Sequence, residues 1–201
     1  MDIQQMYPGA VRLIGARGRA MQIIDAGEDV NQRNELGMTP LQEVAHKCRN
    51  FHVVRALVDA GAEINADDRL VGTPLSIMLR YGMHPEQLQS VLYLIEHGAD
   101  TNVRDQIGQE TPLEYACRYA VEGRHTVVRS LLDHGAEVNP KSPFWTPLHY
   151  AASRGDKELV QMLLEAGAVS VPDTKGRYPI TVAKDEVKEM FIHAKGAQCS
   201  S

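Results

Sequence analysis

The sequence has few cysteines, and those it has lie far apart. Only three occur in 201 residues, Cys48, Cys117 and Cys199. An odd number of widely spaced cysteines is not the pattern of a disulfide framework. Asn-x-Ser/Thr sequons, the usual mark of a secreted glycoprotein, are also absent. We therefore expect the chain to work in a reducing compartment, and we predict a cytoplasmic location.

Long apolar segments and an excess of basic residues are missing as well. No apolar run approaches the roughly 20 residues that a membrane-spanning helix needs, and Asp2 stands where a signal peptide would be basic. The formal net charge is -5 and the pI is about 5.9. Because general nucleic-acid binders neutralise phosphates with cations, we do not expect DNA or RNA as a partner. The missing apolar run leads us to expect no membrane partner either.

Metal-binding and catalytic patterns are not found either. The eight histidines are scattered, and no pair has the H-x-x-x-H spacing of a zinc site. The glycine- and arginine-containing segment at residues 15–19 matches no phosphate-binding loop. A chain of this length buries roughly 70% of the surface of its unfolded form, so it needs no metal for stability. We predict no enzyme activity, no metal site and no cofactor.

What the sequence does contain is a short motif that recurs with a nearly constant period. Thr-Pro-Leu occurs four times, at spacings of 34, 38 and 35 residues, beginning at Thr39, Thr73, Thr111 and Thr146. A second series runs out of phase with the first and consists of Gly27, Gly61, Gly98, Gly135 and Gly167. An asparagine follows the first four of these glycines by four residues, as Asn31, Asn65, Asn102 and Asn139. Two independent markers with one period indicate an internal repeat.

Each marker has a structural reason. Proline is favoured in the first turn of a helix, and the threonine before it can cap that turn. Glycine after an apolar segment such as residues 53–58 supplies the left-handed residue that ends a helix. Turn-forming residues such as Asn34 and Gly176 precede the next proline and predict a short hairpin. The unit is therefore helix, turn, helix, hairpin, and neighbouring units must stack to bury their apolar faces.

This unit resembles the ankyrin repeat, whose motif reads roughly Asp-x-x-Gly-x-Thr-Pro-Leu-His-x-Ala-Ala, then an apolar helix, then Gly-Ala-x-x-Asn. Residues 146–168 follow the motif closely. The resemblance covers residues 10–195 as four full units with degenerate units at both ends. It implies an all-α ankyrin-repeat solenoid of stacked helix-turn-helix units joined by short β-hairpin turns. We predict an ankyrin-repeat domain at residues 1–195 and a flexible tail at residues 196–201.

The resemblance also implies a binding surface. The hairpins and first helices of ankyrin units line a concave face on which partner proteins usually dock. In this chain the fifth hairpin carries two aromatic residues, and basic and aromatic residues follow the Ala-Ala positions. The candidate partner-binding residues are His46, Lys47, Arg80, Tyr81, Arg118, Tyr119, Phe144, Trp145 and Arg154. Because Arg and aromatic residues are enriched in binding hot spots, we expect a partner with acidic and apolar features. The alternative is that these side chains only pack against the next unit.

Some residues depart from the motif or match its structural positions. The third and fourth units are three to four residues longer than the fifth, around residues 83–86 and 120–123. These insertions either form a lip beside the concave face or are tolerated variation in loops. His149 matches the structural histidine of the motif. Cys48 and Cys117 fall on first helices, where buried structural thiols are expected.

We therefore predict a non-catalytic protein–protein interaction module, an adaptor or inhibitor that is monomeric in isolation and binds its partner on the concave face. The alternative is a structural scaffold or a non-catalytic subunit of a larger complex. An enzyme is the least favoured hypothesis, because ankyrin arrays usually owe catalysis to an additional domain. The fold alone does not identify the partner.

Overall fold

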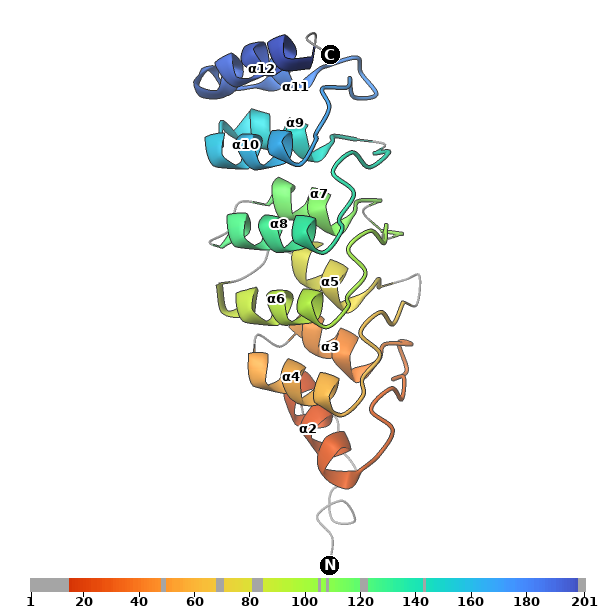
Figure 1. The fold of residues 1–201 in the computed structure, drawn as a ribbon. Coiled ribbons are helices and arrows are strands. Elements are labelled where there is room, and N and C mark those ends of the chain that lie inside the picture. Colours follow the sequence, from red (N-terminus) through yellow and green to blue (C-terminus); the bar gives the residue numbers. More distant parts are fainter. Residues whose placement is uncertain are drawn as a thin grey trace, which may run out of the picture.

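The computed structural model is an elongated stack of helix pairs (Figure 1). It describes residues 15–47, 50–67, 71–80, 85–104, 106–107, 109–119, 123–142 and 144–198. Throughout these ranges every regular element is a helix, and the hairpin connections carry turns without assigned strands. No helix in the same ranges has the length and hydropathy required to span a membrane.

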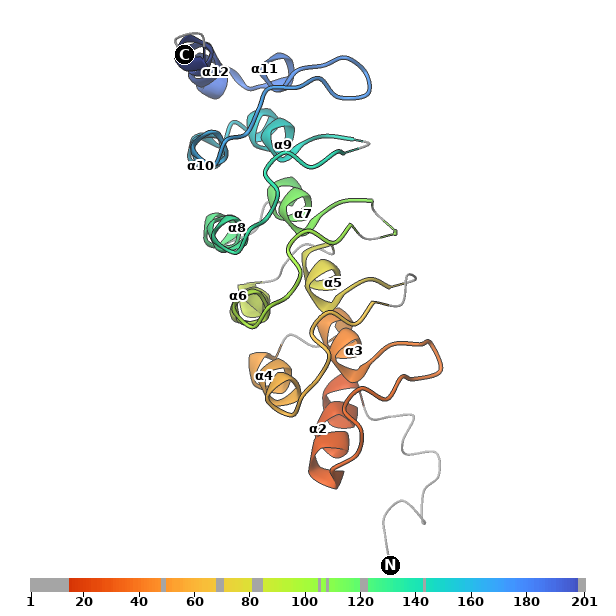
Figure 2. The same cartoon turned by 45° about the vertical axis from the view of Figure 1, so that its right-hand side comes forward.

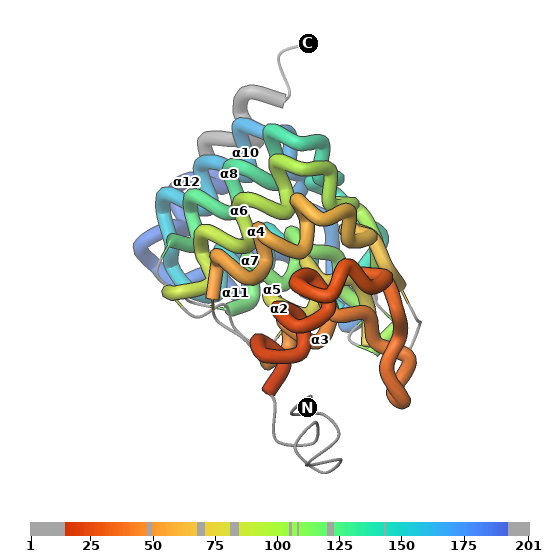
Figure 3. Tube along the Cα trace, turned by 90° about the horizontal axis from the view of Figure 1, so that it is seen from below, coloured from red at the N-terminus to blue at the C-terminus, as the bar shows by residue number. Residues whose placement is uncertain are grey.

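The helices form two columns, and the hairpins form a third (Figure 2). The first helices of the units are α3 (Pro40–Lys47), α5 (Pro74–Arg80), α7 (Pro112–Arg118), α9 (Pro147–Arg154) and α11 (Pro179–Val182). The second helices are α4 (Phe51–Asp59), α6 (Leu88–Glu96), α8 (Arg124–Asp133), α10 (Lys157–Glu165) and α12 (Asp185–Gln198). Helix α2 (Ala16–Ala26) begins the described stack, and the 3-10 turn η2 (Pro85–Gln87) precedes α6. Seen from one end, successive second helices are offset in one direction (Figure 3).

The predicted helix boundaries are confirmed. All five first helices begin at a proline, as the missing proline N–H and its helical φ favour. The periodic glycines that follow α2, α4, α6, α8 and α10 have positive φ angles of 65° to 90°, a conformation that costs glycine little. Helix α12 continues to Gln198, and the predicted boundary between domain and tail at residue 195 stays a prediction.

In two of the Thr-Pro-Leu-x motifs the fourth residue ties its helix to the threonine before it and to the hairpin of the next unit. Gln42 Oε1 accepts a hydrogen bond from the Thr39 N–H (2.9 Å), and Gln42 Nε2 donates to the carbonyl of Gly72 (2.8 Å). His149 holds the equivalent position, with Nδ1 2.8 Å from Thr146 Oγ1 and Nε2 2.8 Å from the carbonyl of Arg177. Both side chains are fully buried. The predicted structural role of His149 is thus confirmed.

The periodic asparagines join consecutive units. Each Nδ2 group donates to the carbonyl of the next unit's helix-ending glycine, and each Oδ1 accepts a backbone N–H two residues beyond that glycine. The pairs lie 2.7 to 3.2 Å apart and involve Asn31, Asn65, Asn102 and Asn139. Buried leucines from both helix columns complete the stack, since Leu41 and Leu75 of the first helices and Leu57 and Leu94 of the second helices are all inaccessible to solvent. One continuous apolar core therefore runs through the units and fixes the spacing of the hairpins.

Candidate functional site

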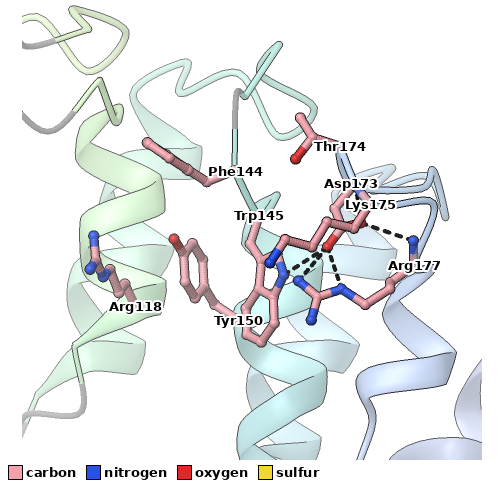
Figure 4. Close-up of a pocket in the computed structure, with 8 residues that line it drawn as sticks. All are labelled: Arg118, Phe144, Trp145, Tyr150, Asp173, Thr174, Lys175 and Arg177. Atoms are coloured by element: carbon pink, nitrogen blue, oxygen red, sulfur yellow. Dashed lines mark hydrogen bonds and ion pairs between the residues drawn. The ribbon is translucent and has the colours of Figure 1, made fainter.

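A pocket of about 350 Å³ opens beside the hairpins of the last units (Figure 4). Three of the predicted partner-binding residues line it, Arg118, Phe144 and Trp145. The sequence did not point to the other lining residues, which are Tyr150, Asp173, Thr174, Lys175 and Arg177. The pocket thus brings together α7, the loop before α9, the start of α9 and the loop before α11.

Trp145 forms the central wall of the pocket. Its indole Nε1 donates a hydrogen bond to Asp173 Oδ2 (3.0 Å). The guanidinium of Arg177 lies 5.5 Å from the Trp145 ring centroid, within the range of a cation–π contact. The rings of His149 and Tyr150 lie 6.0 and 5.4 Å away, centroid to centroid. Contacts on several sides therefore hold the indole in one orientation.

Asp173 organises the turn that closes one side. Its Oδ1 accepts the backbone N–H groups of Lys175 (2.8 Å) and Arg177 (2.9 Å), and its Oδ2 accepts from Arg177 Nη2 (2.7 Å). The side chain is only 2% exposed. Desolvation alone would raise the pKa of Asp173, but the hydrogen bonds from Arg177, Lys175 and Trp145 outweigh it and hold the pKa well below its ordinary value. The carboxylate therefore stays charged, and its own turn together with Trp145 satisfies it.

Arg118 forms the opposite side. Its Nη1 donates to Glu110 Oε2 (2.7 Å), and the other oxygen of this buried carboxylate accepts from the Tyr150 hydroxyl (2.5 Å). Burial and then the hydrogen bond to Glu110 raise the pKa of Tyr150 far above its ordinary value, so the phenol remains a donor. The guanidinium also lies 5.3 Å from the Tyr119 ring centroid and stays partly exposed. Arg118 is thus fixed on one side and accessible on the other.

The remaining predicted site residues lie elsewhere or act in packing. Arg154 Nη1 donates to the carbonyl of Arg118 (2.6 Å), next to the pocket. Arg80 is only 9% exposed and donates to the carbonyl of Val71 (3.0 Å), so it presents little charge to a partner. His46 and Lys47 are exposed at the end of α3, two units away. Tyr81 lies outside the described residues.

Two acidic residues that shape the pocket, Asp173 and Glu110, were not predicted as site residues, although the repeat motif gives a signal for the first. Asp173 and Gly176 fit the Asp-x-x-Gly turn of the motif, so the register places that turn one unit beyond Trp145. The hairpin before α7 is one residue longer than the hairpin before α3. Thr111 follows Gly108 by three positions, whereas Thr39 follows Gly37 by two, so Glu110 is an added residue. No signal in the sequence predicted that this extra acid turns inward.

A second polar cluster lies at the other end of the helices. Arg124 Nη2 and His125 Nε2 (3.0 Å) both contact Asp156, which accepts the Leu159 N–H at the start of α10 (3.0 Å). Desolvation would raise the pKa of Asp156, but the Leu159 N–H and then His125 and Arg124 lower it overall. The cluster ties α8 to α10. The predicted lip lies mostly outside the described residues, which resume at residues 85 and 123.

The cysteine that the structure describes lies in the core. Cys117 is fully buried, and desolvation raises the pKa of its thiol far above its ordinary value, which confirms its structural assignment. Cys48 and Cys199 lie outside the described residues. Where side chains are described, no group of three His, Cys, Asp or Glu residues is arranged to hold a metal ion.

Comparisons with known proteins agree with this architecture. The family model for ankyrin repeats matches three times, at residues 10–105, 71–142 and 86–173. The chain is 24% identical over 208 residues to palmitoyltransferase ZDHHC13 of Homo sapiens, covering 87% of this chain and 33% of that protein. It is 29% identical over 181 residues to the putative ankyrin repeat protein YahD of Escherichia coli (strain K12), covering 84% of this chain and 85% of YahD.

A solved structure has the same fold. The human ASB11 ankyrin repeat domain superposes with a TM-score of 0.70 at 23% identity, covering 89% of this chain and 77% of that domain. The chain spans only about a third of the length of the first curated relatives it matches. Their whole-protein activities therefore do not transfer through these matches.

Proposed function

Because this chain belongs to the ankyrin-repeat family, we propose that it is a non-catalytic module that binds one partner protein with its concave face, as an adaptor or inhibitor. Ankyrin repeats are generally protein–protein interaction modules. The ankyrin fold is typically non-catalytic. We further propose that the chain is monomeric in isolation. Its cysteine pattern and missing sequons support a place in the cytoplasm.

The observation that carries the proposal is a row of large, exposed apolar side chains on three hairpins, those before α3, α7 and α9. Leu36 is 67% exposed, Ile107 56% and Phe144 51%. Leu36 and Ile107 each immediately precede the glycine of the hairpin motif. Single exposed apolar residues are common on protein surfaces, but these three all belong to hairpins of one stack, and Leu36 and Ile107 hold the same position in their hairpins. Exposed apolar side chains gathered on one side of a molecule are typical of an interaction surface.

Cationic groups lie near one end of this row and make it selective. Arg118, Lys175 and Arg177 surround the aromatic pocket although the chain as a whole is acidic. Complementary charge favours the correct partner and disfavours others. These contacts support a partner with acidic and apolar features.

The test is affinity capture of a tagged chain from its native source, with quantitative mass spectrometry. Leu36→Arg combined with Ile107→Arg places charge on the apolar row, while Ile192→Arg makes the same change on α12 as a control. We expect one stoichiometric partner that the wild type and the control recover equally and that the double variant loses.

Two results would contradict the proposal. Recovery of several co-assembling subunits would favour the alternative, a scaffold or subunit of a larger complex. Loss of the partner with Ile192→Arg but not with the double variant would move the binding surface away from the hairpins. Circular dichroism melts of all variants check that the fold is unchanged.

A further inference from the structure

We propose that the pocket around Trp145 recognises a short acidic segment of the partner, in which an apolar side chain lies next to a carboxylate. The inference rests on the proposed protein-binding function and specifies its chemistry. The apolar side chain would pack against Phe144, Trp145 and Tyr150. The carboxylate would lie against Lys175 and Arg177.

The pocket is formed before any partner arrives. Trp145 is fixed by Asp173 and Arg177, and Tyr150 is fixed by its hydrogen bond to Glu110. A wall of ordered aromatic side chains loses little conformational entropy on binding. Phe144 is the exception among the aromatic residues, because it is half exposed and gains cover when an apolar side chain packs on it.

The charges select an acidic occupant. Asp173, which lines the pocket, and Glu110, which binds Arg118 and Tyr150, already accept hydrogen bonds from cations and other donors within the chain. Arg177 uses Nε and Nη2 to bind Asp173, and among the described residues no acceptor binds its Nη1. The described residues likewise provide no ion pair for Lys175. A carboxylate placed here would therefore meet cationic donors, and charge-assisted hydrogen bonds of this kind are strong.

The size of the pocket limits the occupant to a short segment. A volume of about 350 Å³ lies at the lower end of the range for binding pockets in proteins. It accommodates one or two side chains and not a folded surface. The pocket lies between the loops before α9 and α11. These loops belong to the column of hairpins (Figure 2), so an extended segment that leaves the pocket can run along that column.

The probe is a library of heptapeptides with all twenty residues at every position, prepared once with free and once with amidated C-termini. The full chain is immobilised and enriched peptides are sequenced. We expect enrichment of Asp or Glu beside Leu, Ile, Met or Phe in both libraries. Enrichment only in the library with free C-termini would show that the pocket binds a C-terminal carboxylate and not the carboxylate of an Asp or Glu side chain. This result would overturn the proposal as stated.

Matched variants locate the binding. Lys175→Glu should weaken the best enriched peptide at least tenfold in fluorescence anisotropy, and Phe144→Ala at least fivefold. Arg129→Glu on α8 and Ile192→Ala on α12 make the same chemical changes far from the pocket and should change the affinity less than twofold. Lys175 contributes only its backbone N–H to the Asp173 turn, so its replacement should preserve the fold.

Several results would overturn the inference. These are enrichment of neutral or basic peptides, no enrichment above background, or pocket variants that bind within twofold of the wild type. The proposed function is tested separately, because the captured partner is lost with the apolar-row double variant whether or not the pocket contributes. If binding of the partner depends on this row but not on Lys175, the inference about the pocket is wrong and the proposed protein-binding function still holds.

Discussion

Acidification should destabilise the fold through one buried histidine. His149 is inaccessible to solvent, its Nδ1 lies 2.8 Å from Thr146 Oγ1, and its Nε2 lies 2.8 Å from the carbonyl of Arg177. A neutral ring with its proton on Nε2 satisfies these partners, since Nδ1 can then accept from Thr146. Burial lowers the pKa of His149, and the hydrogen bond to Arg177 offsets only part of this effect.

The sign and size of the effect follow from proton linkage. The unfolded chain takes up this proton near the ordinary histidine pKa of about 6.5, whereas the folded chain takes it up at lower pH. Stability is therefore fully present above about pH 6.5 and is lost as the pH falls toward the lowered pKa. The slope for one proton is at most about 1.4 kcal/mol per pH unit.

The matched variant is His149→Gln. Gln42 occupies the equivalent position of the second unit, where it accepts the threonine N–H and donates to a loop carbonyl. Glutamine should thus replace both hydrogen bonds at position 149 within about 1 kcal/mol at pH 7.5, and it does not titrate. Urea unfolding followed by circular dichroism, from pH 7.5 to 5.0, compares the two chains. We expect the wild type to lose more stability than the variant below pH 6.5. Parallel curves would refute the reasoning, because the seven other histidines are common to both chains.

Three further predictions concern the stack itself. Asn102→Ala removes two hydrogen bonds to the next unit (2.8 and 2.7 Å) and should lower the free energy of unfolding by about 1–3 kcal/mol. The control, Gln161→Ala on the exposed face of α10, should change it by less than about 0.5 kcal/mol. Equal losses in the two variants would argue against a stabilising role of the periodic asparagines. Cys117 should resist iodoacetamide at pH 8 until urea unfolds the chain, as peptide mapping would show, and rapid labelling of the folded chain would contradict its burial. Gly123→Ala should lower the unfolding free energy by about 1–2 kcal/mol, because φ is 79° and the new Cβ would lie 2.7 Å from a methyl of Leu88; an unchanged urea midpoint would show that the helix start relaxes.

The repeat register could be read from the sequence because it depends on local backbone chemistry. Proline at a helix start and glycine at a helix end act within a few residues. Helix α7 begins at Pro112, and Gly135 has a positive φ just after α8, as these preferences predict. The stacking of units then follows from the need to bury the apolar faces of both helices. The family comparison and the helical structure confirm this part of the prediction.

The pocket could be predicted only in part, because it depends on contacts between side chains of different units. The aromatic pair at residues 144–145 departs from the repeat motif and so could be predicted as part of the site. The hydrogen-bond partner of the indole, Asp173, lies 28 residues away in the sequence, and this contact could not be predicted. Arg80 and Arg118 occupy corresponding positions in the sequence, yet the first is buried against a loop carbonyl and the second faces the pocket. Glu110, an added residue with no equivalent at residues 37–39, anchors Arg118 and accounts for part of this difference.

Hydrogen exchange of the captured complex tests the central claim most directly. Mass spectrometry would compare deuterium uptake of the chain with and without its partner, peptide by peptide. We predict slower exchange at the hairpins and first helices, at residues 109–119, 144–154 and 171–182, with little change in α8 and α10. Protection confined to the second helices, with the hairpins unchanged, would contradict binding on the concave face.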